Sequence, residues 1–165
     1  MTIGRFNAGI AAVIWSPETS QYLFLRRAEH KDYAPGVWEW VTGRVEQGEG
    51  YEDALHREVR EELGASVHIE HILGTTHFYR GSPSPDNELL GVVYLCTLAS
   101  EANIRIGPEH AEFRWLSAGE ALGLLSASDS STQWTRRVLQ RLIAILPRLS
   151  EDLMKFQRQS GFEFG

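Results

Sequence analysis

The sequence contains a single cysteine and no long apolar run, and these two absences limit what the chain can be. Cys96 cannot form a disulfide within the chain, which favours a reducing, cytoplasmic location. It lies in the run GVVYLCTL, where we expect a small buried side chain rather than a nucleophile. No segment approaches the ~20 apolar residues that a membrane helix requires, so no membrane span is expected.

The sequence also lacks an excess of positive charge. The formal net charge of the 165 residues is -6. A protein that binds long DNA or RNA needs a basic surface, so long nucleic acids are not expected as partners. A small phosphorylated molecule remains compatible with this charge, because a bound cation can reverse the local field.

The start of the chain, MTIGRFNAGIAAVIW, has neither a basic leader nor a clear cleavage site. It therefore predicts a first strand rather than a signal peptide. We find no internal repeat and no low-complexity segment. The length fits one compact domain over residues 1–165, in which the tail from about Phe156 is expected to fray.

Apolar patterning predicts strands interspersed with two main helices, typical of a layered α/β or α+β domain. Gly64 and Pro147 are predicted to end the helices, and the segment SASDSST to supply the N-cap of the second. The expected strands cover residues 7–15, 22–26, 38–41, 67–80, 89–98, 104–106 and 113–116, and the expected helices cover residues 52–63 and 133–146.

The segment from Gly43 to Ala65, GRVEQGEGYEDALHREVREELGA, carries the pattern that points to chemistry. At about 100° per residue, its helical part has one apolar stripe and an acidic arc beside it. The acidic arc lies at the shoulder of the buried face, where a cleft can form. The stripe consists of Leu55, Val59 and Leu63, and the arc of Glu58, Glu61 and Glu62.

Such an arc is a poor arrangement for stability alone. Each like-charge pair at helical contact spacing costs roughly 0.2–0.5 kcal/mol. A divalent cation relieves that repulsion, and Mg²⁺ prefers hard oxygen ligands shared between carboxylates and phosphates. The alternative is a solvated acidic face that Arg57 and Arg60 partly neutralise.

The same segment resembles the Nudix box: Gly, five residues, Glu, seven residues, Arg-Glu, an aliphatic residue, any residue, Glu-Glu, any residue, Gly. Only the last position, Ala65, is a weak match to the family's aliphatic residue. The resemblance implies a Nudix-type α/β/α sandwich with a mixed β-sheet between helices. The matching positions are Gly43, Glu49, Arg57, Glu58, Val59, Glu61, Glu62 and Gly64.

The resemblance also implies an activity: hydrolysis of a diphosphate linkage in a nucleotide-like compound, with Mg²⁺ as cofactor and Mn²⁺ as a substitute. Water would attack a phosphorus atom. Glu58, Glu61 and Glu62 match the family's metal ligands, and a backbone carbonyl near Thr42 or Gly43 is implied as a further ligand.

Three further roles follow from the same resemblance. Arg57 matches the residue that orients the glutamates, and Glu49 matches the first Glu of the box, which binds metal or supports Arg57. Glu61 is a candidate general base, with Glu109 and Glu112 as alternatives outside the box.

The residues before the box bear on the substrate. Val41 and Thr42 stand where nucleotide-pool-cleaning members usually carry Pro-Gly. This lead-in, with Glu109-His110 and Trp115-Leu116 later in the chain, is more similar to dihydroneopterin triphosphate pyrophosphatases and dinucleoside polyphosphate hydrolases. Candidate substrate-binding residues are Arg26, Arg27, Trp38, Trp40 and Phe78, with Tyr79 and Trp134 as further aromatic side chains for stacking.

Several alternatives stay open. One is a Nudix-like domain that senses a nucleotide without cutting it, although degenerate boxes usually mark such proteins and this box is intact. An RNA-decapping enzyme would need a basic surface or a further domain. No spacing of histidines with Cys96 favours zinc. The sequence leaves open the substrate, the number of metal ions and whether the chain forms a homodimer.

Overall fold

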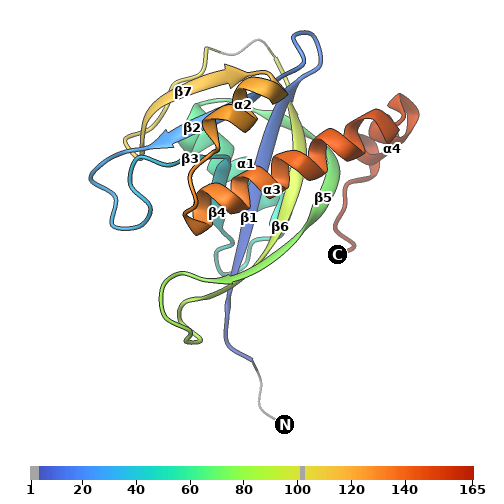
Figure 1. Ribbon diagram of the computed structural model, residues 1–165. Coiled ribbons are helices and arrows are strands. Elements are labelled where there is room, and N and C mark those ends of the chain that lie inside the picture. Colours follow the sequence, from blue (N-terminus) through green and yellow to red (C-terminus); the bar gives the residue numbers. More distant parts are fainter. Residues whose placement is uncertain (1–3, 101–102) are drawn as a thin grey trace.

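Strand β1 (Asn7–Ser16) is the central strand in the computed structural model, which describes residues 4–100 and 103–165 (Figure 1). It pairs in parallel with β6 (Glu88–Leu98) and antiparallel with β4 (Val41–Arg44) and β2 (Gln21–Arg27). The other pairs are antiparallel. The sheet is completed by β5 (Val67–Tyr79) beside β6, and by β3 (Trp38–Glu39) and β7 (His110–Leu116) beside β2.

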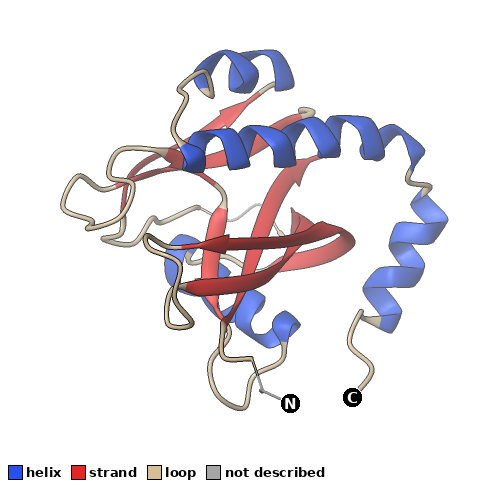
Figure 2. Ribbon diagram, turned by 60° about the horizontal axis from the view of Figure 1, so that its bottom comes forward, coloured by secondary structure: helices blue, strands red, loops and turns tan. Residues whose placement is uncertain are grey.

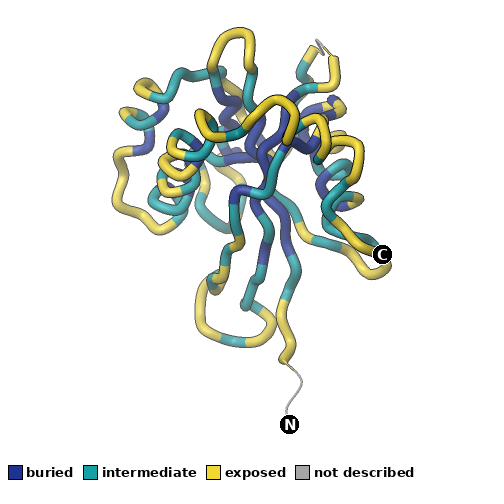
Figure 3. Tube along the Cα trace, turned by 90° about the vertical axis from the view of Figure 1, so that its right-hand side faces the viewer, coloured by how far each residue is buried: buried dark blue, intermediate teal, exposed yellow. Residues whose placement is uncertain are grey.

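The two faces of β1 supply the two halves of the core. Successive side chains of a strand point to opposite faces, so a strand covered on both sides is a continuous apolar run. Ile10 and Ile14 pack on the side of α1 (Tyr51–Leu63), whereas Val13 packs on the side of α3 (Ser130–Ile145). The helices thus enclose a mixed sheet, as predicted (Figure 2). Buried residues concentrate in the middle of this sheet (Figure 3).

Helix α1 ends at Gly64, as predicted. Gly64 adopts φ +61°, a left-handed conformation that suits glycine, and its N–H donates to the carbonyl of Arg60. The strand expected at residues 104–106 is wrong. Arg105 and Gly107 instead donate their backbone N–H groups to the carbonyls of Leu63 and Glu62. The segment therefore caps the end of α1 and has no strand partner.

The strand predicted over residues 38–41 is two strands with different partners. β3 pairs with β2, and β4 pairs with β1. Trp40 lies at the break between them, fully buried, with its ring centroid 4.2 Å from that of Phe24. Trp38 and Trp40 therefore do not belong to one continuous strand, because the chain changes partners between them.

Helix α2 (Ala118–Leu124) was not predicted, although it begins with a capping box of Ser117 and Glu120 that is present in the sequence. Helix α3 takes its N-cap, Asp129, from SASDSST as expected, but it begins at Ser130 rather than at residue 133. It gives way near Pro147 to the short 3₁₀ helix η1 (Leu146–Arg148).

Helix α4 (Glu151–Ser160) corrects the expectation of fraying from Phe156. Ser150 caps its first turn by accepting a hydrogen bond from the N–H of Leu153. Near its end, Arg158 donates to the buried carboxylate of Glu70 on β5. A polar anchor that lies far away in the sequence therefore orders a segment whose own composition predicts fraying.

Two further observations agree with the sequence. Cys96 is fully buried, and burial raises the pKa of its thiol, as expected of a packing residue. Among residues 4–100 and 103–165, the helices are too short or too polar to cross a lipid bilayer.

The anchor of α4 yields a prediction about stability. The side chain of Glu70 is fully buried and that of Arg158 is 41% exposed, with 2.6 Å between Nε and Oε2. Arg158→Ala leaves a buried carboxylate without its cation and should lower the free energy of unfolding in urea by about 2 kcal/mol, a value discounted for the exposure of Arg158. Lys155→Ala, on the same helix, is the control. Equal urea midpoints for the two variants would contradict the assignment.

Candidate functional site

Helix α1 places its three box glutamates in a graded series from core to solvent. Its apolar stripe is buried against the sheet. The side chain of Glu62 is 9% exposed, that of Glu58 is 14% exposed, and that of Glu61 is 60% exposed. The acidic arc lies at the rim of the buried face, which is the position that the helical pitch predicts.

Gly43 on β4 lies directly against Glu58. A Cβ atom at this position would stand 2.0 Å from Cδ of Glu58, far closer than two non-bonded carbon atoms can approach. The glycine is therefore required by close approach, which brings the backbone of β4 against the acidic rim of α1.

Arg57 on α1 contacts both Glu49, the first Glu of the box, and Glu58, its neighbour on the helix. Its Nε and Nη2 atoms donate to the two carboxylate oxygens of Glu49 at 2.7 and 2.9 Å, and Nη1 donates to Glu58 at 2.8 Å. Nη2 also donates to the carbonyl of Arg44, and Nη1 lies 3.5 Å from Glu61. The bidentate pair lowers the pKa of Glu49 to about 2, so Glu49 stays ionised.

Glu62 carries a buried carboxylate oxygen, Oε2, without a hydrogen-bond partner among the described residues. Burial, together with the neighbouring Glu39, Glu58 and Glu109, raises the pKa of Glu62 well above its usual value. Burial also raises the pKa of Glu58. Unpaired buried carboxylates are costly, and a bound cation offsets that cost.

The donor set of the site consists of hard carboxylate oxygens, which fit Mg²⁺ or Mn²⁺. In the part of the chain that the structure describes, no three acidic, histidine or cysteine side chains converge in a metal-coordinating cluster. The guanidinium of Arg57 binds Glu58 and lies near Glu61. A cation here would have to compete with Arg57 for these oxygens.

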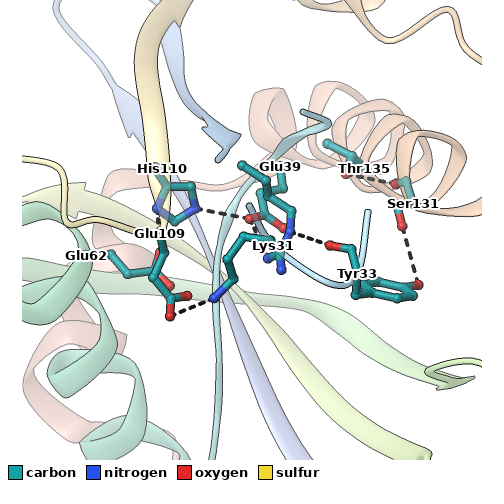
Figure 4. Close-up of polar contacts among 9 residues, drawn as sticks. Lys31, Tyr33, Glu39, Glu62, Glu109, His110, Ser131 and Thr135 are labelled. Atoms are coloured by element: carbon teal, nitrogen blue, oxygen red, sulfur yellow. Dashed lines mark hydrogen bonds and ion pairs between the residues drawn. The ribbon is translucent and has the colours of Figure 1, made fainter. Parts of the chain in front are cut away.

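A buried polar network lies behind Glu62 (Figure 4). His110 on β7 places Nε2 3.1 Å from Oε1 of Glu39, and Arg27 donates to the same oxygen at 3.0 Å. The other ring nitrogen, Nδ1, lies 4.0 Å from the unpaired oxygen of Glu62 and has no hydrogen-bond partner among the described residues. Two buried polar atoms thus face each other across a narrow gap.

The loop before β7 supplies Glu109, whose carboxylate binds Lys31 at 2.9 Å (Figure 4). The hydrogen bond from Lys31 lowers the pKa of Glu109. Glu112 lies further along β7, beside Arg114 at 2.7 Å, and does not line the cleft.

These residues surround a cleft of about 760 Å³. Its lining contains equal numbers of basic and acidic side chains, so the cleft is nearly balanced although the whole chain is acidic. The lining also contains aromatic side chains, among them Phe78, Tyr79 and Trp134. The basic residues are Arg27, Lys31, Arg44, Arg57, Arg80 and Arg137, and the acidic residues are Glu39, Glu46, Glu58, Glu61, Glu62 and Glu109.

The structure separates the predicted substrate residues into two groups. Arg27 and Phe78 line the cleft. Arg26 does not line it and instead binds Glu29 at 2.7 Å. Trp38 also lies outside, with the guanidinium carbon of Arg114 4.8 Å from its ring centroid. The prediction that Trp40 binds substrate is wrong, because its ring is sealed in the core.

The partly buried carboxylate of Glu39 was not predicted from the sequence, in which His110 stood out only as part of a short motif. A charged residue between two tryptophans in WEW was an available signal for a partly buried polar group. Tyr33 was also missed, and its hydroxyl accepts a hydrogen bond from Ser131 on α3 at 3.4 Å. That loop and α3 meet only in the tertiary structure.

Comparison with known proteins agrees with this geometry. Residues 5–142 match the NUDIX domain. The chain is 31% identical over 102 residues to "Nucleoside triphosphatase NudI" of Escherichia fergusonii. The matched region covers 58% of this chain and 72% of the relative. The MutT protein of Methanosarcina mazei shares the fold, with a TM-score of 0.69 and 22% identity over 87% of this chain and 97% of that one.

The dihydroneopterin triphosphate pyrophosphohydrolase of E. coli is similar in fold as well, with a TM-score of 0.61 and 24% identity over 85% of this chain and 98% of that one. The NUDIX match spans most of the sequence, including the whole of the box and the strands that carry it. The chain belongs to the Nudix hydrolase family.

Proposed function

We propose that this Nudix hydrolase catalyses the Mg²⁺-dependent hydrolysis of a phosphoanhydride bond in a nucleotide-like triphosphate. The observation that carries the proposal is the buried, unpaired oxygen of Glu62 at the edge of the cleft, beside Glu58. An acidic rim without a cation would repel a triphosphate. The same rim with a divalent cation attracts one.

Glu58, Glu61 and Glu62 would hold the cation, with the backbone at Gly43 beside them. When bound, the ion neutralises charge on the phosphate oxygens and lowers the pKa of water. Arg57 keeps the carboxylates in place through Glu49 and supplies a fixed positive charge next to the phosphates.

Among the candidate bases, Glu61 is the best supported. Its side chain lines the cleft and is 60% exposed, so a carboxylate oxygen that the cation does not occupy can reach a water molecule and accept its proton. Glu109 also lines the cleft, but Lys31 binds its carboxylate and lowers its pKa, which makes it a weaker base. Glu112 lies outside the cleft and is not supported.

The side chains that line the cleft indicate how a nucleotide would bind. Lys31 and Arg27, which contact Glu109 and Glu39, suit phosphate oxygens. Phe78 and Trp134 also line the cleft and offer aromatic rings on which a base can stack. Trp134 is fixed by a hydrogen bond from Nε1 to Oγ1 of Thr76 at 3.0 Å. The name of the relative from E. fergusonii supports a nucleoside triphosphate as the first substrate to test.

The wild-type protein should release phosphate or pyrophosphate from a panel of nucleoside triphosphates, dinucleoside polyphosphates, sugar nucleotides and dihydroneopterin triphosphate. EDTA should abolish turnover, and Mg²⁺ or Mn²⁺ should restore it. Glu62→Gln should lower kcat at least about 10²-fold, because it removes a charged ligand. Binding without turnover across the panel would favour a sensing domain instead.

A second prediction concerns Gly43. Gly43→Ala places a methyl group 2.0 Å from Cδ of Glu58 and must displace that side chain. We expect at least a 10-fold loss in kcat and weaker Mg²⁺ binding in calorimetry. Gly119→Ala in α2 is the matched control, because a Cβ there meets nothing within 4 Å. The close approach has no role in the site if both variants behave like the wild type.

The base assignment is tested by comparing Glu61→Gln with Glu109→Gln. At saturating Mg²⁺ and substrate, Glu61→Gln should lower kcat by about 10²-fold or more, and Glu109→Gln should have the smaller effect. Steady-state kinetics between pH 6 and pH 9 measures both. The reverse order of effects would assign the base to Glu109.

A further inference from the structure

Helix α1 begins without a side-chain cap of its own. Its N-cap residue is Gly50, which has no side chain to accept a hydrogen bond from the first turn. The free N–H groups of Tyr51 and Glu52 donate instead to the carboxylate of Glu163, at 2.8 and 3.0 Å. The cap therefore comes from a segment 111 residues away from Glu52.

The contact is reciprocal. The carboxylate of Glu52 accepts the backbone N–H groups of Phe162 and Glu163. The arrangement resembles a capping box, in which two residues exchange side-chain to backbone hydrogen bonds, except that Glu52 and Glu163 lie on segments distant in the sequence. The positive end of the helix dipole offsets the charge of Glu163. Gly50 leaves the space for it, since a Cβ there would stand 2.4 Å from Oε2 of Glu163.

Packing holds the capping segment on both sides of Glu163. The ring of Phe162 contacts Tyr94 of the core edge-on, with centroids 6.0 Å apart. Before it, α4 turns steeply away from the end of α3 (Figure 2) and is tied to β5 by Arg158 and by Gln157, whose Oε1 lies 3.2 Å from Nδ1 of His71. Residues 157–163 thus form a strap from β5 to the start of α1.

The capped end of α1 adjoins the clamp of the site. Gly50 directly follows Glu49, which holds Arg57, which in turn holds Glu58. Glu49 also accepts the N–H of Glu46 at 2.9 Å, so the loop that leads into Gly50 is tied to α1 through Glu49 and Arg57. Loosening the first turn would loosen the anchor of Arg57.

We propose that Glu163 is a positioning residue for the site, acting through the first turn of α1 and the Glu49–Arg57 clamp. The strap lies beyond residues 5–142, the part that matches the NUDIX domain. The inference rests on the proposed function, because it assigns to the strap an effect on Mg²⁺ binding.

The test compares Glu163→Ala, Glu163→Gln and a control, Glu18→Gln, in the exposed turn between β1 and β2. Mass-spectrometric hydrogen exchange of the folded proteins should show faster exchange over residues 50–53 in Glu163→Ala. The apparent Mg²⁺ affinity, by calorimetry and by the Mg²⁺ dependence of kcat, should fall about five-fold, a size that the loss of one helix cap allows. Glu163→Gln, which keeps one acceptor oxygen, should recover part of both effects.

Unchanged exchange over residues 50–53 in Glu163→Ala would show that the cap is not formed in solution. Faster exchange with wild-type Mg²⁺ affinity and kcat would make the cap purely structural. Either result overturns the positioning role of Glu163. The proposed function is tested separately, by Mg²⁺-dependent turnover of the wild-type protein. A wild type without Mg²⁺-dependent turnover would overturn both.

Discussion

The contact between β4 and α1 at Gly43 and Glu58 fixes the geometry on which the site depends. One helix has to bury an apolar stripe in the core and still present carboxylates to a cleft. It meets both requirements because the acidic arc lies at the edge of the stripe and because a glycine lets the neighbouring strand approach the arc closely. A larger residue at that point would move either the strand or the carboxylate.

Charge is then distributed in layers around this contact. Arg57 faces the exposed side of the arc and binds the ionised Glu49. Behind the arc, Arg27 and His110 contact the partly buried Glu39. Between these layers Oε2 of Glu62 has no hydrogen-bond partner among the described residues. A buried polar atom without a hydrogen bond lowers the stability of the fold. Such atoms are common at functional sites, where a bound ligand or ion offsets the loss.

The same helix is supported at both ends by segments that are distant in the sequence. Gly107 and Arg105 satisfy the carbonyls at its end, and Glu163 satisfies the amides at its start. Backbone groups at helix termini have no partners within the helix, so every such contact fixes the helix relative to the rest of the fold. The position of the carboxylates is therefore a property of the whole domain.

The sequence by itself determined the family, the layered fold and the acidic rim. The box is a local pattern, and the helical period alone places Glu58, Glu61 and Glu62 beside the stripe. The substrate side was decided by tertiary structure. Trp40 is sealed in the core because the chain changes sheet partners there, and Glu39 and His110 meet only because β3 and β7 both flank β2. Local periodicity carries no information about such pairings between distant segments. The strap that ends at Glu163 was predicted to fray for the same reason, because its contacts with β5 and with the start of α1 are made only in the tertiary structure.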